Sequence, residues 1–217
     1  MALMLAIIVC LAGIFAILLL SEVLAQRKIL SGDPRRQFVH IAAGCFIAFW
    51  PWLVSFDTIV WLGIAMLGVV LLNRRRKLAD FYTNVERKSY GDVCFALAVI
   101  VTALVTDEKA FFALGMLTMA LADGLANVIG QRYGKNWRYE FLGHTKTVLG
   151  SMTIWLVSMS VLGVGLLLAK DSIDYPAYST LLIAVPPILV LVENVALWGL
   201  DNLLVPIVVV AALSMVQ

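Results

Sequence analysis

Residues 2–20 read ALMLAIIVCLAGIFAILLL and carry no charge over 19 positions. As a helix, about 19 residues at roughly 1.5 Å each span the hydrocarbon core of a bilayer. No basic segment precedes this stretch, its apolar run is longer than that of a signal peptide, and no convincing small-residue cleavage site follows. We therefore predict a retained membrane helix at the start of the chain.

The composition extends this prediction to the whole chain. Charged residues make up 14% and hydrophobic residues 62% of the 217 residues, and the mean hydropathy is +0.97. A soluble domain carries roughly 25% charged residues. We predict an all-α, polytopic transmembrane helical bundle of seven or eight helices, forming a single integral membrane catalytic domain over residues 1–217 with a peripheral first helix at 1–25. Apolar runs place the helices near residues 2–25, 38–55, 58–73, 92–106, 110–129, 147–169, 177–193 and 203–216.

The connections between these helices alternate in charge. All Lys and Arg residues except Lys109 and Lys170 fall in the connections after the first, third and fifth predicted helices, whereas the other connections are short and acidic. By the positive-inside rule the basic side is cytoplasmic, so we predict the N-terminus outside. The unusual polar residues near the helix ends gather on the same side, where soluble nucleotides are available. They are His40, Asp92, Asp123, Asn127, His144, Glu193 and Asp201.

Two groups near predicted helix starts are candidates for chemistry. Arg36 and His40 are four residues apart and share a helix face, so Arg36 would bind phosphate and His40 would bind substrate or transfer a proton. The alternative is a basic anchor at the membrane surface with a capping histidine. Asp92 follows Tyr90-Gly91 and either has a catalytic or metal-binding role or is simply favoured by the dipole at a helix N-terminus.

Asp123 and Asn127 also lie four residues apart, near the cytoplasmic end of the fifth predicted helix. An aspartate in an apolar segment is costly unless it faces a partner, water or a metal. Carboxylate and amide oxygens suit Mg²⁺, and Glu193 and Asp201 near the C-terminus would complete such a site. The alternatives are a polar contact between helices for the first pair and simple charge balance for the second.

Residues 130–151 combine glycines, cations and hydroxyls that suit phosphate. The candidates are Gly130, Gly134, Lys135, Lys146, Thr147 and Ser151. The Walker A pattern G-x-x-x-x-G-K-[ST] is absent, because Asn136 follows Lys135 and the glycine spacing differs. Lys146 falls at the start of the sixth predicted helix, where the dipole repels a cation, which indicates a bound anion. The alternative is a basic loop that contacts lipid headgroups.

Taken together, these motifs resemble the polyprenol kinase family, which includes dolichol kinase, phytol kinase and the yeast-type CTP-dependent diacylglycerol kinase. The similarity rests on Arg-Arg-x3-His-x3-Gly at 35–44, Tyr-Gly-Asp at 90–92, Ala-Asp-x2-Ala-x2-Ile-Gly-x3-Gly-Lys at 122–135, Lys-Thr-x2-Gly-Ser at 146–151 and Glu-x7-Asp-Asn-x3-Pro at 193–206. It covers a family-like core at 35–206, and 122–151 is its most specific part. Family members commonly have Lys-Ser-x-Glu-Gly-Ser where this chain has Leu149 in place of the glutamate.

The resemblance implies a polytopic membrane enzyme that uses Mg²⁺, a nucleoside triphosphate, typically CTP, and a lipid acceptor. ATP stays an open alternative to CTP. The nucleotide region would contain Asp123, Lys135, Lys146 and Ser151, and the rest of the pocket Arg36, His40, Asp92, Glu193 and Asp201. We expect phosphorylation of a lipid alcohol of polyprenol, phytol, dolichol or diacylglycerol type on the cytoplasmic face. No nucleic-acid partner is expected, and homo-oligomerisation stays open.

Two other functions remain as alternatives. A phosphatidate cytidylyltransferase, a more distant relative, would use the same cations and metal, but a lipid phosphate would attack the α-phosphoryl group of CTP. The longer signature of those enzymes is not visible here, which favours the kinase. A transporter or scaffold would place polar residues near the bilayer midplane and carry repeated halves, and neither feature is apparent.

Overall fold

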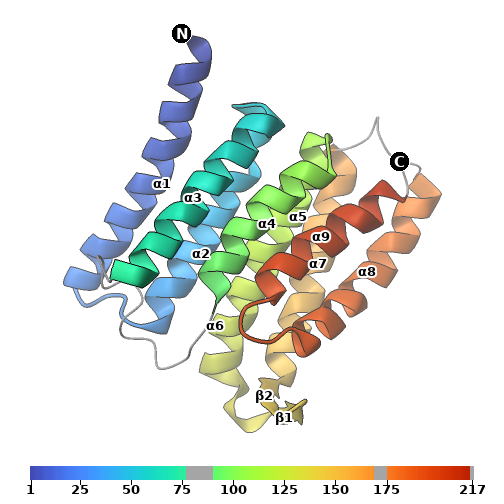
Figure 1. The fold of residues 1–217 in the computed structure, drawn as a ribbon. Coiled ribbons are helices and arrows are strands. Elements are labelled where there is room, and N and C mark those ends of the chain that lie inside the picture. Colours follow the sequence, from blue (N-terminus) through green and yellow to red (C-terminus); the bar gives the residue numbers. More distant parts are fainter. Residues whose placement is uncertain (77–89, 169–174, 216–217) are drawn as a thin grey trace.

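The computed structural model describes residues 1–76, 90–168 and 175–215, and helices dominate this part of the chain (Figure 1). The helices are α1 (Ala2–Gln26), α2 (Asp33–Ala48), α3 (Phe56–Arg76), α4 (Gly91–Val105), α5 (Lys109–Thr118), α6 (Gly124–Tyr133), α7 (Val148–Leu168), α8 (Tyr175–Val195) and α9 (Asp201–Ser214). A π-helical turn, η2 (Met119–Asp123), joins α5 and α6 into one continuous helical segment. The predicted all-α membrane bundle is confirmed.

The bundle is built around α5 and α9. Helix α9 packs against α4, α5 and α8, and α5 also contacts α2 and α7. The side chains of Phe111, Phe112 and Met116 on α5 are almost fully buried as a result. Helix α1 lies at the edge of the bundle and packs against α2 (Figure 1). In the described residues five helical segments are long and apolar enough to cross a membrane, namely α1, α3, α5–α6, α7 and α8.

The second helix begins and ends earlier than predicted. It covers Asp33–Ala48 rather than 38–55, because Pro34 is well suited to the first turn of a helix and Pro51 lies in a short 3₁₀ turn, η1 (Trp50–Trp52), beyond its end. Arg36 and His40 therefore lie inside α2, and they keep the four-residue spacing that places them on one face.

Residues 138–147 form a β-hairpin, which the sequence analysis did not predict. Strand β1 (Arg138–Phe141) pairs antiparallel with β2 (His144–Thr147). Leu142 and Gly143 connect them with φ angles of 48° and 77°, as in the tight turns whose twist matches that of paired strands. Helix α7 consequently starts at Val148, so the prediction that Lys146 begins a helix, and the dipole argument built on it, was wrong.

Most of the predicted site residues lie at one end of the bundle, which we call the polar end. It comprises the connections 27–32, 90–92, 133–148 and 195–201, which are at the lower end in Figure 1, and the adjoining helical residues 33–40, 123–132, 149–151, 193–194 and 202. Hydrogen bonds tie distant segments together there. The Tyr90 amide donates to the Trp198 carbonyl at 2.8 Å, and Asn202 Nδ2 donates to the Gly91 carbonyl at 3.0 Å.

Candidate active site

Asp123 lies at the centre of the candidate site, at the last residue of the π-helical turn. Its side chain is buried, with the residue 7% exposed. Asn127 Nδ2 donates to Asp123 Oδ1 at 2.9 Å and to the Asp123 carbonyl at 3.1 Å. His40 Nε2 faces the other carboxylate oxygen, Oδ2, at 3.6 Å. The predicted Asp123–Asn127 pair therefore exists, and α2 adds the imidazole to it.

The imidazole of His40 is held in place from two sides. Its ring packs edge-on against Phe95, with centroids 5.3 Å apart, and it lies near the backbone of Met119 at the start of the π-helical turn. Nε2 is buried and has no hydrogen-bond partner among the described residues. Because buried nitrogens are normally paired, an unpaired one beside a carboxylate is suited to receive a substrate group.

The close approach of α2 to the π-helical turn depends on small residues. A Cβ atom at Gly44 would lie 2.5 Å from Ala120 Cβ. A Cβ atom at Gly124 would clash with the Ile41 side chain and approach His40 Cδ2 at 3.5 Å. Single π-helical turns are frequent at functional sites, and here the turn ends on the residue that faces His40.

Lys146 reaches the site from strand β2 rather than from a helix. Its Nζ donates to Glu193 Oε1 at 2.5 Å and to the Glu193 carbonyl at 2.8 Å. Both side chains are mostly buried, at 19% and 15% exposure. The predicted phosphate-binding lysine and the predicted metal-binding glutamate are thus partners of one another in this structure.

The surroundings of Asp123 carry several further charges. Asp123 interacts electrostatically with Glu193, Lys146 and Arg36, and Asp201 interacts with Asp123, Lys146 and Glu193. Three carboxylates therefore share this region with two cations. The excess of negative charge is suited to a bound cation, although Lys146 already neutralises Glu193.

The carboxylates of the site fit an Mg²⁺ ion that takes its remaining ligands from the substrate phosphates. The described residues contain no cluster of three or more His, Cys, Asp or Glu side chains placed to hold a metal. Mg²⁺ in phosphoryl-transfer sites commonly takes only one or two protein carboxylates, with phosphates and water as its other ligands. Asp123 and Asp201 meet that requirement, and the metal roles predicted for Asp123, Asn127, Glu193 and Asp201 stay predictions.

Thr147 occupies the space that the glycines of the predicted phosphate loop leave open. Cβ atoms at Gly130 and Gly134 would each lie 2.7 Å from the Thr147 side chain, and one at Gly150 would lie 2.9 Å from its Oγ1. The Gly150 amide donates to Thr147 Oγ1 at 3.1 Å, which caps the first turn of α7. These glycines thus allow the hairpin to pack closely on α6 and α7, and their phosphate-binding role stays a prediction.

Other predicted residues lie around this centre. Arg36 is partly buried and forms an ion pair with Asp33, with Nη2 and Oδ1 at 3.6 Å, whereas Lys135 is exposed on a 3₁₀ turn, η3 (Gly134–Asn136). Asp92 accepts hydrogen bonds at both carboxylate oxygens from Arg74, with Nε–Oδ2 at 2.9 Å. A catalytic role for Asp92 stays a prediction, and in this structure the carboxylate joins α3 to α4.

Three of the basic residues on which the predicted membrane topology rests lie outside the described residues. They are Lys77, Arg87 and Lys88.

Three residues at the polar end were not among the predicted site residues: Tyr139, Asn194 and Asn202. The Tyr139 hydroxyl lies 2.6 Å from Ser151 Oγ and donates to Asn194 Oδ1 at 2.8 Å. Asn202 Oδ1 is buried without a hydrogen-bond partner among the described residues. Each asparagine directly follows a candidate acid in the sequence, and this was the signal that could have found it. Tyr139 had no such signal, because only the hairpin brings it to the site.

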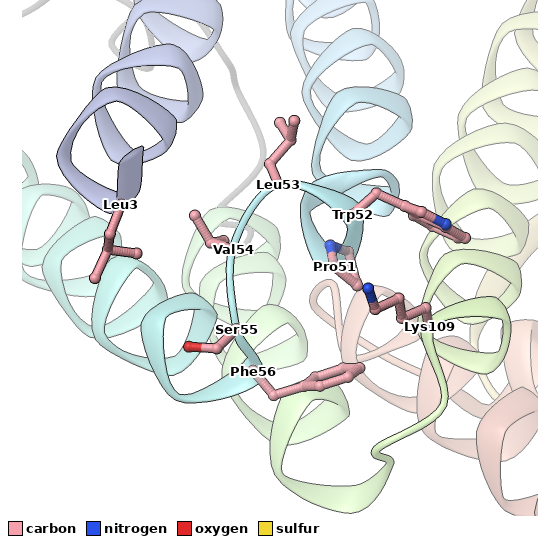
Figure 2. Close-up of a pocket in the computed structure, with 8 residues that line it drawn as sticks. All are labelled: Leu3, Pro51, Trp52, Leu53, Val54, Ser55, Phe56 and Lys109. Atoms are coloured by element: carbon pink, nitrogen blue, oxygen red, sulfur yellow. The ribbon is translucent and has the colours of Figure 1, made fainter. Parts of the chain in front are cut away.

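A separate pocket of about 470 Å³ lies at the opposite end of the bundle. Figure 2 shows Leu3, Lys109 and the segment Pro51–Phe56 around it. It contains none of the predicted site residues. The candidate site is therefore assigned from the side chains that meet at the polar end and not from this pocket.

Two curated relatives resemble the chain over most of its length. The phytol kinase of Synechocystis sp. is 32% identical over 202 residues, which cover 88% of this chain and 83% of the relative. The chain belongs to the polyprenol kinase family. A probable chloroplastic phytol kinase 1 of Glycine max is 25% identical over 221 residues, covering 93% of this chain and 72% of the relative. No family model and no solved structure matches the chain.

Membership of the polyprenol kinase family supports a multi-pass membrane protein with lipid kinase activity. The family motifs at 35–44, 122–135, 146–151 and 193–206 are the segments that supply His40, Asp123, Lys146 and Glu193 to the polar end. Residues far apart in the sequence thus meet in one site.

Proposed function

We propose that this lipid kinase transfers the γ-phosphoryl group of CTP to the hydroxyl of phytol or a similar lipid alcohol, with Mg²⁺ as its cofactor. The observation that carries the proposal is the buried pair of His40 and Asp123, 3.6 Å apart at the polar end of a membrane bundle. The name of the Synechocystis relative supports phytol as the acceptor, and the resemblance to the family supports CTP as the donor.

His40 is the residue best suited to handle the proton of the lipid alcohol. Neutral imidazole accepts a proton at its free nitrogen, and Nε2 of His40 is unpaired among the described residues. The hydroxyl oxygen would attack the γ-phosphorus, the bond from that phosphorus to the β–γ bridging oxygen would break, and the hydroxyl proton would pass to Nε2. The nearby Asp123 carboxylate stabilises the resulting imidazolium.

The cations and carboxylates around His40 would bind and align the triphosphate. Phosphoryl transfer depends mainly on positioning and on neutralising the charge of the phosphoryl oxygens. Lys146 and Arg36 supply positive charge near Asp123, and Lys135 extends it along the exposed surface. Asp123 and Asp201 would hold Mg²⁺, which when bound would neutralise charge on the phosphate oxygens.

We place this site on the cytoplasmic face, with the N-terminus outside. The basic residues of the first, third and fifth connections support that orientation through the positive-inside rule. Cytoplasmic nucleotide then reaches the polar end from solvent, while the lipid alcohol reaches it from the bilayer.

The test is label transfer by the purified protein in detergent with Mg²⁺. CTP or ATP labelled at either the γ or the α phosphate is supplied with phytol, other lipid alcohols or phosphatidate. We expect label to reach phytol from the γ position only. Transfer from the α position to phosphatidate would instead show a cytidylyltransferase. No transfer to any acceptor from either nucleotide would overturn the proposal.

A further inference from the structure

Two side chains of the β-hairpin dock side by side on the end of α8. Tyr139 and Lys146 are direct cross-strand partners, so their side chains share one face of the hairpin. Lys146 donates to Glu193 and Tyr139 donates to Asn194, and the two acceptors are consecutive residues. The position of the lysine and the docking of the tyrosine are therefore coupled through the hairpin.

The hydroxyl of Tyr139 links two helices. It lies 2.6 Å from Ser151 Oγ on α7 and 2.8 Å from Asn194 Oδ1 on α8. A phenol has one proton, and Tyr139 donates it to Asn194, so the Ser151 hydroxyl must donate to Tyr139. We call these residues, Ser151, Tyr139 and Asn194, the hydroxyl clamp.

We propose that Tyr139 is a positioning residue that holds Lys146 at the nucleotide phosphates through the hydroxyl clamp. The inference rests on the proposed kinase function, because it assigns Lys146 to the nucleotide. The clamp fixes the hairpin at the hydroxyl of Tyr139, while Lys146, across the ladder, keeps its amine beside the carboxylates near Asp123. With the clamp broken, Lys146 would sample positions away from the phosphates.

The hydroxyl clamp also implies that Ser151 does not have the phosphate-binding role predicted from the sequence. Its single proton goes to Tyr139, so it has none left to donate to a phosphate oxygen. Ser151 then acts through Tyr139. This makes the effects of changing Ser151 and Tyr139 dependent on one another.

The primary test is Tyr139→Phe, which removes the hydroxyl and keeps the ring. We expect KM for CTP to rise about three- to thirtyfold, with kcat and KM for phytol changing less than about twofold. Tyr133→Phe is the matched control, because Tyr133 is an exposed tyrosine of neighbouring α6, and it should keep the wild-type values. A purely structural role would instead lower the thermal midpoint and the active fraction without changing KM for CTP, and that result would overturn the inference.

A second test uses Ser151→Ala and the double variant. In a clamp, Ser151→Ala has a smaller effect on KM for CTP than Tyr139→Phe, and the double variant is no worse than Tyr139→Phe alone. Additive effects would show that Ser151 binds the nucleotide independently and would overturn the clamp. An inactive wild-type protein would count against the proposed function, whereas an active wild-type with an unchanged Tyr139→Phe variant would count against the clamp alone.

Discussion

At the scale of single residues, the sequence indicates the chemistry of the site's side chains. It does not indicate which of these side chains contact one another. Asp123 and Asn127 lie one helical turn apart, so their contact follows from spacing alone. The ion pair of Lys146 and Glu193 joins residues 47 positions apart, and local periodicity carries no information about such a contact. Both residues could be named as candidates from the sequence, but their pairing could not.

His40→Gln tests the proposed proton transfer. Glutamine keeps a polar side chain but cannot act as a base near neutral pH, so we expect kcat to fall about 10²-fold or more with little change in KM for CTP. His144→Gln is the matched control, because His144 is exposed at the end of the hairpin. It should retain activity within about twofold. Similar activity in both variants would remove His40 from the chemistry.

At the scale of elements, the ends of the helices and the hairpin are the features that the sequence did not predict correctly. The apolar runs locate each helix, because about 20 apolar residues in a membrane form a helix almost without alternative. The hairpin was not predicted because each strand has only four residues and β2 (HTKT) contains no apolar residue that would mark it as a strand. Leu142-Gly143 was the available signal, since a glycine at a turn permits the positive φ angle that a tight hairpin needs.

The packing of α2 on the π-helical turn can be tested through Gly44. A Cβ atom there would lie 2.5 Å from Ala120 Cβ, so Gly44→Ala must push the two segments apart. We expect a loss of about 1–3 kcal/mol in the free energy of unfolding. Activity should fall as well, because His40 and Asp123 lie on these two segments.

Gly68→Ala on α3 provides the matched control for this substitution. Apart from the neighbouring backbone of α3, no atom of the described residues lies within 4 Å of a Cβ at Gly68, so the change should be neutral or stabilising by up to about 1 kcal/mol. Thermal unfolding in detergent measures both variants. Equal stability of the two would show that α2 and the turn do not pack as closely as the structure indicates.

At the scale of the whole molecule, the polar end brings together residues from six of the helices and from the hairpin. The sequence predicts that these residues share one side of the membrane, because basic connections alternate with acidic ones. It does not predict which of them meet, since that depends on how α2 packs on α6, how α6 and α8 pack on α7, and how α9 packs on α8. The general location of the site was thus predictable, whereas its internal geometry was not.

The orientation of the bundle can be tested with single cysteines. The background is a variant with Cys10, Cys45 and Cys94 replaced by alanine and shown to be active. Glu140→Cys lies in the exposed hairpin and Asp57→Cys at the opposite end of the bundle. In intact cells we expect a membrane-impermeant maleimide to label Asp57→Cys but not Glu140→Cys, which should react only after permeabilisation. The reverse pattern would place the polar end outside.

The most direct measurement of the central claim compares Asp123→Asn with Asp107→Asn. Asp123 is buried beside His40, whereas Asp107 is exposed between α4 and α5 at the other end of the bundle. Both purified variants are assayed for phosphoryl transfer from γ-labelled CTP to phytol, with thermal unfolding as the check on folding. We expect Asp123→Asn to fold but to lose about 10²-fold or more in rate, and Asp107→Asn to keep the wild-type rate. A folded Asp123→Asn variant within about twofold of the wild-type rate would show that the reaction does not take place at this site.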